Sequence, residues 1–161
     1  MNKVAKYIML ISCIGILTAI DLISKSLFDG KILDFIPNFI SIYGLSHNSG
    51  AAFSSFENSI LLFIILAVLF LIFCLIYEYK TIKTKKHIVY YIGGVFLLAG
   101  TIGNMIDRVI FGYVRDFIKL EFMNFPIFNI ADCALTIGVI FLAIYIFFFH
   151  NESKKVKVEE I

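Results

Sequence analysis

The sequence predicts an integral membrane protein that is mainly α-helical, with four transmembrane helices and a small β-sheet outside the membrane. Of the 161 residues, 60% are hydrophobic and only 16% are charged, and the mean hydropathy is +0.93. A soluble core with a solvated surface cannot be built from this composition. Four long runs contain no Asp, Glu, Lys or Arg, and they lie at residues 7–20, 60–77, 88–106 and 133–149.

These runs set four expected spans, at residues 4–20, 60–77, 88–106 and 133–149. A helix needs about 17–25 mostly apolar residues to cross a bilayer, and the last three runs have that length. The first run is shorter, so its span is expected to start at Val4, with the Lys6 side chain reaching back to the headgroups. We therefore expect residues 1–161 to form one membrane-embedded domain, with a flexible tail at 151–161.

The basic residues predict the orientation of the chain. Nine of the 14 Lys and Arg residues lie on one side of the expected spans, namely Lys3, Lys6, Lys80, Lys83, Lys85, Lys86, Lys154, Lys155 and Lys157. By the positive-inside rule, both termini are expected to be cytoplasmic. The net charge of only +2 gives no reason to expect nucleic-acid binding.

Two long polar loops, at about 21–59 and 107–129, are expected on the outer side of the membrane, and we expect function there. Residues 39–47 are rich in Ile, Phe and Tyr, and residues 114–122 alternate with a period of two. Both patterns are typical of strands. The loops therefore predict a small sheet over the membrane surface.

Two aspartates, Asp116 and Asp132, lie at the mouth of a span, where carboxylates are costly to place. If the fold brings them together, they form a site for acid and base chemistry, because two close carboxylates tend to share one proton. Structural roles are the alternative. Asn129 is a good N-cap for the fourth span, and the helix dipole favours Asp132 in its first turn. Asp116 on a strand is by default a solvated or cross-strand charge.

Other polar residues have helical spacing near the same side of the membrane. Asp21 and Lys25 are spaced i, i+4, so on a continuing helix they would meet as an ion pair. Gly100, Asn104 and Arg108 would line one face of the third span, with Gly100 allowing close helix approach. Packing explains these residues as well as a site does. An arginine beside two carboxylates would also lower their pKa or bind a lipid phosphate.

The cysteines and histidines do not indicate a metal or cofactor. Cys13, Cys74 and Cys133 are odd in number and lie inside apolar runs, which is typical of small buried hydrophobic residues. The three histidines show no ligand spacing. The sequence therefore predicts no metal and no cofactor.

Two other functions fit some of these residues. A small transporter would use Asp21, Asp107 and Asp132 as relays, but the charges gather at one face, and spans two and four lack ionisable residues near mid-membrane apart from the Cys74 thiol. A lipid phosphotransferase would hold magnesium with aspartates and phosphate with Arg108. It would normally face its nucleotide on the cytoplasmic side, opposite to the predicted orientation.

Five segments together resemble, in order and spacing, the five motif blocks of bacterial lipoprotein signal peptidase, also called signal peptidase II. They are Asp21–Lys25, Asn48–Phe53, Gly103–Arg108, Val114–Phe117 and Phe128–Asp132. The resemblance runs from the first span to the fourth. It implies an aspartic endopeptidase of the bacterial cytoplasmic membrane that removes signal peptides from prolipoproteins. Such an enzyme hydrolyses the bond before a diacylglyceryl-modified cysteine, with water as the nucleophile.

The resemblance also implies roles for residues. The catalytic pair maps onto Asp116 and Asp132. Positions that shape or support the site are matched by Asp21, Lys25, Asn48, Gly50, Gly100, Asn104, Asp107, Arg108, Asn129 and Ala131. A sheet-like cradle is implied to hold the prolipoprotein over the pair, and globomycin-type cyclic peptides are implied inhibitors. Membrane lipids are further expected partners, and we expect a monomer.

Overall fold

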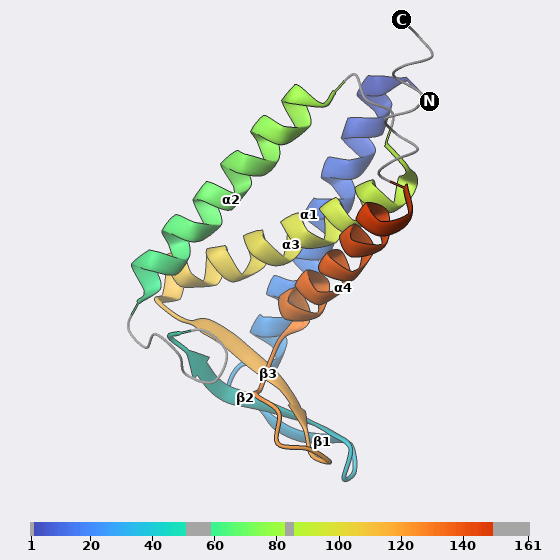
Figure 1. Ribbon diagram of the computed structural model, residues 1–161. Coiled ribbons are helices and arrows are strands. Elements are labelled where there is room, and N and C mark those ends of the chain that lie inside the picture. Colours follow the sequence, from blue (N-terminus) through green and yellow to red (C-terminus); the bar gives the residue numbers. More distant parts are fainter. Residues whose placement is uncertain (1, 51–58, 83–85, 150–161) are drawn as a thin grey trace, which may run out of the picture.

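The computed structural model describes residues 2–50, 59–82 and 86–149. Residues 51–53, which complete one motif block, and the predicted tail 151–161 lie outside the described residues. Figure 1 shows four long helices with a small sheet at one end of the bundle. We call this end the sheet end and the opposite one the distal end. Helix α1 starts and the fourth helix finishes at the distal end (Figure 1).

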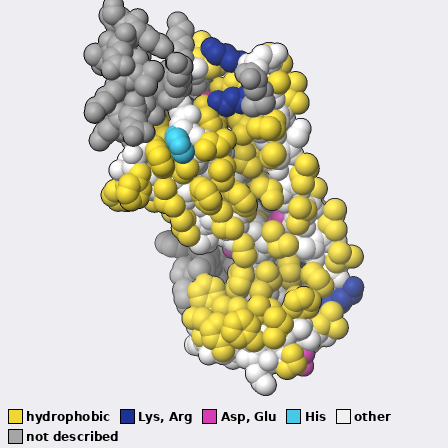
Figure 2. Space-filling view, turned by 90° about the vertical axis from the view of Figure 1, so that its right-hand side faces the viewer, with side chains coloured by type: hydrophobic (Ala, Val, Ile, Leu, Met, Phe, Trp, Pro, Cys, Tyr) yellow, Lys and Arg dark blue, Asp and Glu magenta, His cyan; other side chains and the backbone are white. Residues whose placement is uncertain are grey.

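Four helices are long and apolar enough to cross a membrane, so the predicted four-span architecture is confirmed. They are α1 (Lys3–Phe28), α2 (Ile60–Lys80), α3 (Ile88–Phe111) and α4 (Ile130–Ile144), the last continued by the π-helical turn η2 (Tyr145–Phe149). Most large apolar side chains on them are exposed, and Figure 2 shows hydrophobic side chains covering much of one face of the molecule. That surface suits contact with lipid rather than with water.

The helices reach further at the sheet end than the spans 4–20, 88–106 and 133–149 predicted from the sequence. Each predicted span stopped at a charged residue, whereas the fold gives those charges partners and keeps the helix intact. Correspondingly, the predicted loops 21–59 and 107–129 are shorter, because parts of them are helical. The corrected boundaries are Phe28 for the end of α1, Phe111 for the end of α3 and Ile130 for the start of α4.

Helix α3 is the central helix, and α1 and α4 pack against it (Figure 1). A Cβ atom at Gly100 would collide with the carbonyl oxygen of Ala131, and one at Gly93 or Gly138 would collide with a leucine of the facing helix. Small residues therefore let the backbones of α3 and α4 approach closely. Helix α2 lies to one side of the other three and has no buried residue.

The strands predicted at 39–47 and 114–122 are confirmed. Strand β1 (Ile32–Ile36) pairs with β2 (Ile40–Asn48), and β2 pairs with β3 (Val114–Leu120), all antiparallel. Asn38, with φ of 59°, lies in the turn between β1 and β2, a conformation that asparagine tolerates better than most residues. The register sets Ser46 opposite Asp116, which brings Asp116 close to the end of β2.

Candidate active site

Asp116 and Asp132 lie on different elements, but they share a hydrogen-bond partner. Asp116, on β3, is only 3% exposed, and its Oδ1 accepts a hydrogen bond of 2.6 Å from Nδ2 of Asn129. The backbone N–H of Asn129 donates to Oδ2 of Asp132 at 3.1 Å. One buried residue, Asn129, therefore bonds both carboxylates, and the fold brings the two aspartates into one site.

Asn129 can do this because it is also the N-cap of α4, as its place in the sequence predicted. Its Oδ1 accepts from the backbone N–H of Asp132 at 3.0 Å, which completes a capping box with Asp132. This bond fixes the orientation of the amide, so its Nδ2 is available to Asp116. The Asp132 carboxylate is held in the first turn of α4, where the helix dipole favours a negative charge.

Asn104, on α3, holds the other oxygen of Asp132. Its Nδ2 donates to Oδ1 of Asp132 at 2.8 Å. The side-chain oxygen of Asn104, Oδ1, accepts from Nζ of Lys25 at 2.9 Å and from Nδ2 of Asn129 at 3.1 Å. Two donors on that oxygen settle which way the amide faces. The N–H group of Asn104 therefore points at Asp132.

The end of β2 closes the site on the side of Asp116. Nδ2 of Asn48 donates to Oδ2 of Asp116 at 3.1 Å, and Oδ1 of Asn48 accepts from the N–H of Gly50 at 3.0 Å. Nη2 of Arg108 donates to the carbonyl oxygen of Gly50 at 3.2 Å. The Arg108 guanidinium also lies over the ring of Phe63, with its Cζ 4.9 Å from the centroid. Arg108 thus connects α3 to the end of β2 and to α2.

A group of four buried charges lies beside the two aspartates. It consists of Asp21 and Lys25 on α1, Asp107 on α3 and Arg115 on β3. Nζ of Lys25 is 2.8 Å from Oδ2 of Asp21, which confirms the predicted ion pair, and 3.5 Å from Oδ2 of Asp107. Arg115 pairs with Asp107 at 2.8 Å. Two acids are thus matched by two bases, and we call these residues the buried quartet.

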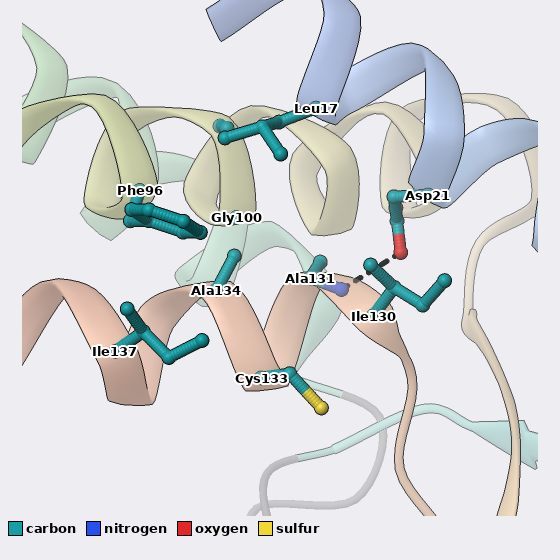
Figure 3. Close-up of a pocket in the computed structure, with 10 residues that line it drawn as sticks. Leu17, Asp21, Phe96, Gly100, Ile130, Ala131, Cys133, Ala134 and Ile137 are labelled. Carbon is teal, nitrogen blue, oxygen red and sulfur yellow. Dashed lines mark hydrogen bonds between the residues drawn. The ribbon is translucent and has the colours of Figure 1, made fainter. Parts of the chain in front are cut away.

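Asp21 also connects the quartet to α4. Its Oδ1 accepts a hydrogen bond of 2.8 Å from the backbone N–H of Ala131, in the first turn of α4 (Figure 3). This bond satisfies an N–H that has no partner within the helix. Gly103 lies against the same carboxylate, since a Cβ atom there would collide with Oδ2 of Asp21. The start of α4, including Asp132, is therefore held by α1.

A small apolar cavity of about 80 Å³ lies between α1, α3 and α4, next to the bond from Ala131 to Asp21 (Figure 3). Ile130, Ala134 and Ile137 line it from α4. Neither Asp116 nor Asp132 is among the residues that line it. The cavity is therefore separate from the two carboxylates.

The surroundings of the two aspartates differ. Burial and the charge of Asp132 raise the pKa of Asp116 to about 7, although the hydrogen bonds from Asn48 and Asn129 lower it. Near neutral pH, Asp116 therefore holds a proton for a large part of the time. Asp132 is less buried, and it lies in the first turn of α4, where the helix dipole favours a negative charge. The two carboxyl groups therefore lie close together in different environments.

Of the ten residues predicted to support the site, Asn48, Asn104 and Asn129 hydrogen-bond the two aspartates directly, and the other seven lie further out at the same end of the bundle. Eight of them take part in the side-chain or backbone contacts described above, namely Asp21, Lys25, Asn48, Gly50, Asn104, Asp107, Arg108 and Asn129. Gly100 and Ala131 contribute close packing of α3 on the first turn of α4, and Ala131 also donates its N–H to Asp21. Among the described residues, no cluster of three or more His, Cys, Asp or Glu could hold a metal ion.

Sequence reasoning did not single out Arg115, although it lies in one of the motif blocks. Its alternation with Asp116 on a strand was a signal that the two side chains point to opposite faces. Its partner, Asp107, lies on a different element, so spacing along the chain could not reveal the pair.

The chain matches known proteins along most of its length. The family model described as Signal peptidase (SPase) II matches residues 13–148. A lipoprotein signal peptidase of Enterococcus faecalis is 44% identical over 129 residues, which are 80% of this chain and 78% of that protein. A lipoprotein signal peptidase of Clostridioides difficile is 35% identical over 144 residues, covering 86% of this chain and 95% of that protein.

Solved structures agree with these matches. A bacterial membrane enzyme determined at 2.3 Å resolution has a TM-score of 0.76 and 32% identity, covering 86% of this chain and 87% of that chain. A second, determined at 1.9 Å, has a TM-score of 0.74 and 32% identity, covering 88% and 94%. The chain therefore belongs to the signal peptidase II family, and it is a multi-pass membrane peptidase.

Proposed function

We propose that this protein removes signal peptides from prolipoproteins by hydrolysing the bond before a diacylglyceryl-modified cysteine, with Asp116 and Asp132 as the catalytic dyad. The observation that carries this proposal is the bridge through Asn129, which bonds both carboxylates in one buried site. The family of the chain supports the class of substrate.

In the proposed reaction, Asp132 starts ionised and Asp116 starts protonated. Asp132 takes a proton from a water molecule as the water oxygen attacks the scissile carbonyl carbon. Asp116 donates a hydrogen bond to the carbonyl oxygen, where negative charge develops. When the C–N bond breaks, Asp116 gives its proton to the leaving amine. The pair then holds one proton, as before the reaction, but on the other aspartate.

The supporting residues have structural roles in this proposal. Asn104 and Asn129 fix the orientation of Asp132, and Asn48 holds Asp116. Arg108 positions the end of β2 through the carbonyl of Gly50 and does not transfer protons. Close packing at Gly100 and Ala131 keeps the start of α4 against α3. The water is activated by the carboxylates, so the reaction as proposed requires no metal and no cofactor.

We place the protein in the bacterial cytoplasmic membrane, with both termini in the cytoplasm and the sheet end outside. Lys6, Lys80 and Lys86 at the distal end support this orientation. The lipidated end of a signal peptide lies near the outer interface, which is the depth of the dyad in this orientation. Exposed aromatic residues such as Phe35 on β1 and Phe39 in the turn before β2 would face membrane lipid and the acyl chains of the substrate.

The proposal is tested by cleavage of a diacylglyceryl-modified prolipoprotein with the purified protein in detergent. We expect a product that starts with the lipidated cysteine, identified by mass spectrometry, and the same rate in EDTA. The unmodified prolipoprotein and a globomycin-type peptide serve as controls, the first as a poor substrate and the second as an inhibitor. A cut at another bond, or no cut by well-folded protein, would contradict the proposal.

A further inference from the structure

We propose that Arg115 is a positioning residue for Asp132. It acts through three buried residues, Asp107, Lys25 and Asn104, which connect it to the dyad in that order. The inference rests on the proposed function, in which Asp132 is the general base.

Arg115 is built into the protein as a fixed group. Its side chain is largely buried, and it holds Asp107 with a fork in which Nη2 lies 2.8 Å from Oδ1 and Nε lies 3.3 Å from Oδ2. The backbone N–H of Arg115 adds a bond of 3.0 Å to Oδ2. Nη1 donates to the hydroxyl of Ser26 at 3.2 Å, and the guanidinium lies 4.3 Å from the ring centroid of Phe111. Among protein side chains, only arginine makes such a bidentate contact with a carboxylate.

Lys25 passes the effect of Arg115 to the dyad. Its ammonium has three N–H donors, and three acceptors surround it: Asp21 at 2.8 Å, Asn104 at 2.9 Å and Asp107 at 3.5 Å. Asp107 is the most distant of the three, because Arg115 already neutralises it. Lys25 can therefore direct one N–H at the side-chain oxygen Oδ1 of Asn104.

Loss of the Arg115 side chain would change how Lys25 divides its contacts among Asp21, Asn104 and Asp107. Asp107 is fully buried, so its charge would need another cation, and Lys25 is already in contact with it. Lys25 would move toward Asp107 and away from Asn104. The side-chain oxygen Oδ1 of Asn104 would keep only the bond from Asn129, and the side-chain amide of Asn104 would be free to rotate. Asp132 would then lose the 2.8 Å bond that fixes one of its oxygens.

The test compares Arg115→Met with Lys119→Met in the cleavage assay. Lys119 is a matched control, because it carries the same charge on the same strand, but its side chain is 41% exposed and pairs with Glu121. We expect Arg115→Met to lower kcat by about tenfold to a hundredfold, as a small misplacement of a catalytic group does. We expect KM within about twofold, because substrate binding is not touched. Lys119→Met should leave both constants unchanged.

Two further variants separate positioning from folding. Arg115→Lys keeps the charge but not the fork, so it should recover part of the lost kcat. In an Asp107→Asn background, Arg115→Met should cost much less than it does alone, because the carboxylate that pulls on Lys25 is no longer charged. Thermal unfolding in detergent checks that each variant is folded.

The outcomes are decisive in each case. Wild-type kcat in folded Arg115→Met, an equal loss in Lys119→Met, or the same loss with and without Asp107→Asn would each overturn the inference. If Arg115→Met does not fold, wild-type kcat in Arg115→Lys would overturn it. Asp132→Asn in the same series separates the two proposals, because activity in that variant would contradict the proposed function itself.

Discussion

Both ends of the helix bundle hold charged side chains that are buried or half-buried, but these charges are paired differently at the two ends. At the distal end, Glu78 of α2 accepts hydrogen bonds from Lys86 at 2.5 Å and from the hydroxyls of Tyr7 and Tyr90 at 2.9 Å each. One acid there is matched by one base and two neutral donors. We call these four residues the distal cluster. At the sheet end, the buried quartet is also balanced, but Asp116 and Asp132 are added beside it.

The difference teaches that buried charge alone does not mark the functional site. The distal cluster connects α2 to α1 and α3, which α2 needs because none of its own residues is buried. Its acid is fully partnered, so it supports stability. At the sheet end, two carboxylates share Asn129, and the charge of Asp132 helps to raise the pKa of Asp116 to about 7. Two like groups placed together are the feature that indicates reactivity.

Substitution of either dyad aspartate, at the sheet end, should have the largest effect on cleavage. Asp116→Asn and Asp132→Asn should each lower the cleavage rate by about 10³-fold or more, because each removes the acid or the base of the reaction. Both variants should remain folded and inserted in membranes. Asp34→Asn, an exposed aspartate on β1, is the control and should keep wild-type activity. Robust turnover by either dyad variant would remove that residue from the mechanism.

Asn129→Ala should have the next largest effect, because it breaks the bridge without changing a charge. The Asn129 side chain donates to the Asp116 carboxylate and accepts from the backbone N–H of Asp132, and loss of these two bonds should lower kcat by about a hundredfold. Loss of the N-cap should lower the free energy of unfolding by about 1 kcal/mol. Rate measurements and thermal unfolding follow the two effects separately. A stability loss with unchanged kcat would mean that Asn129 is a cap only.

At the distal end, Glu78→Ala should lower the stability of the protein but leave kcat almost unchanged. It leaves Lys86, whose side chain is 2% exposed, without its acid, so the free energy of unfolding should fall by about 1–3 kcal/mol. The value of kcat in the folded fraction should stay within about twofold of wild type, because no contact in the dyad changes. Lys80→Ala, at an exposed lysine of the same helix end, is the control. A hundredfold loss of kcat in Glu78→Ala would contradict the contrast between the two ends.

The smallest expected effect is a shift in pH dependence. Because Asp116 must be protonated, activity should fall as the pH rises through its pKa of about 7. The hydrogen bond from Asn48 lowers that pKa, so Asn48→Ala should raise it and move the basic limb of the pH profile to higher pH. A limb that stays in place, or moves to lower pH, would show that Asp116 is not the group that titrates.

Much of this fold could be predicted from the sequence, because local patterns determine it. Charge-free runs predicted the four helices, and period-two alternation predicted β3. The i, i+4 spacing predicted the ion pair between Asp21 and Lys25. The N-cap at Asn129 was also local. Each of these features depends on residues a few positions apart.

Features that depend on distant partners could not be predicted in this way. α1 continues through Asp21 because that carboxylate accepts from Ala131, 110 residues later. Similarly, Tyr7 and Glu78 of the distal cluster are 71 residues apart, and no spacing rule links them. The proximity of Asp116 and Asp132 was a hypothesis from the sequence, and only the fold brings both to Asn129.

The central claim is that Asp116 and Asp132 share one proton. Infrared spectroscopy of the protein with isotope-labelled aspartate, recorded over a pH titration, measures protonated carboxyl groups directly. We predict one aspartic acid signal that titrates near pH 7, is absent in Asp116→Asn and moves to lower pH in Asp132→Asn, because the charge of Asp132 raises the pKa of Asp116. No aspartic acid titrating near neutral pH, or a signal that Asp132→Asn leaves in place, would contradict the claim.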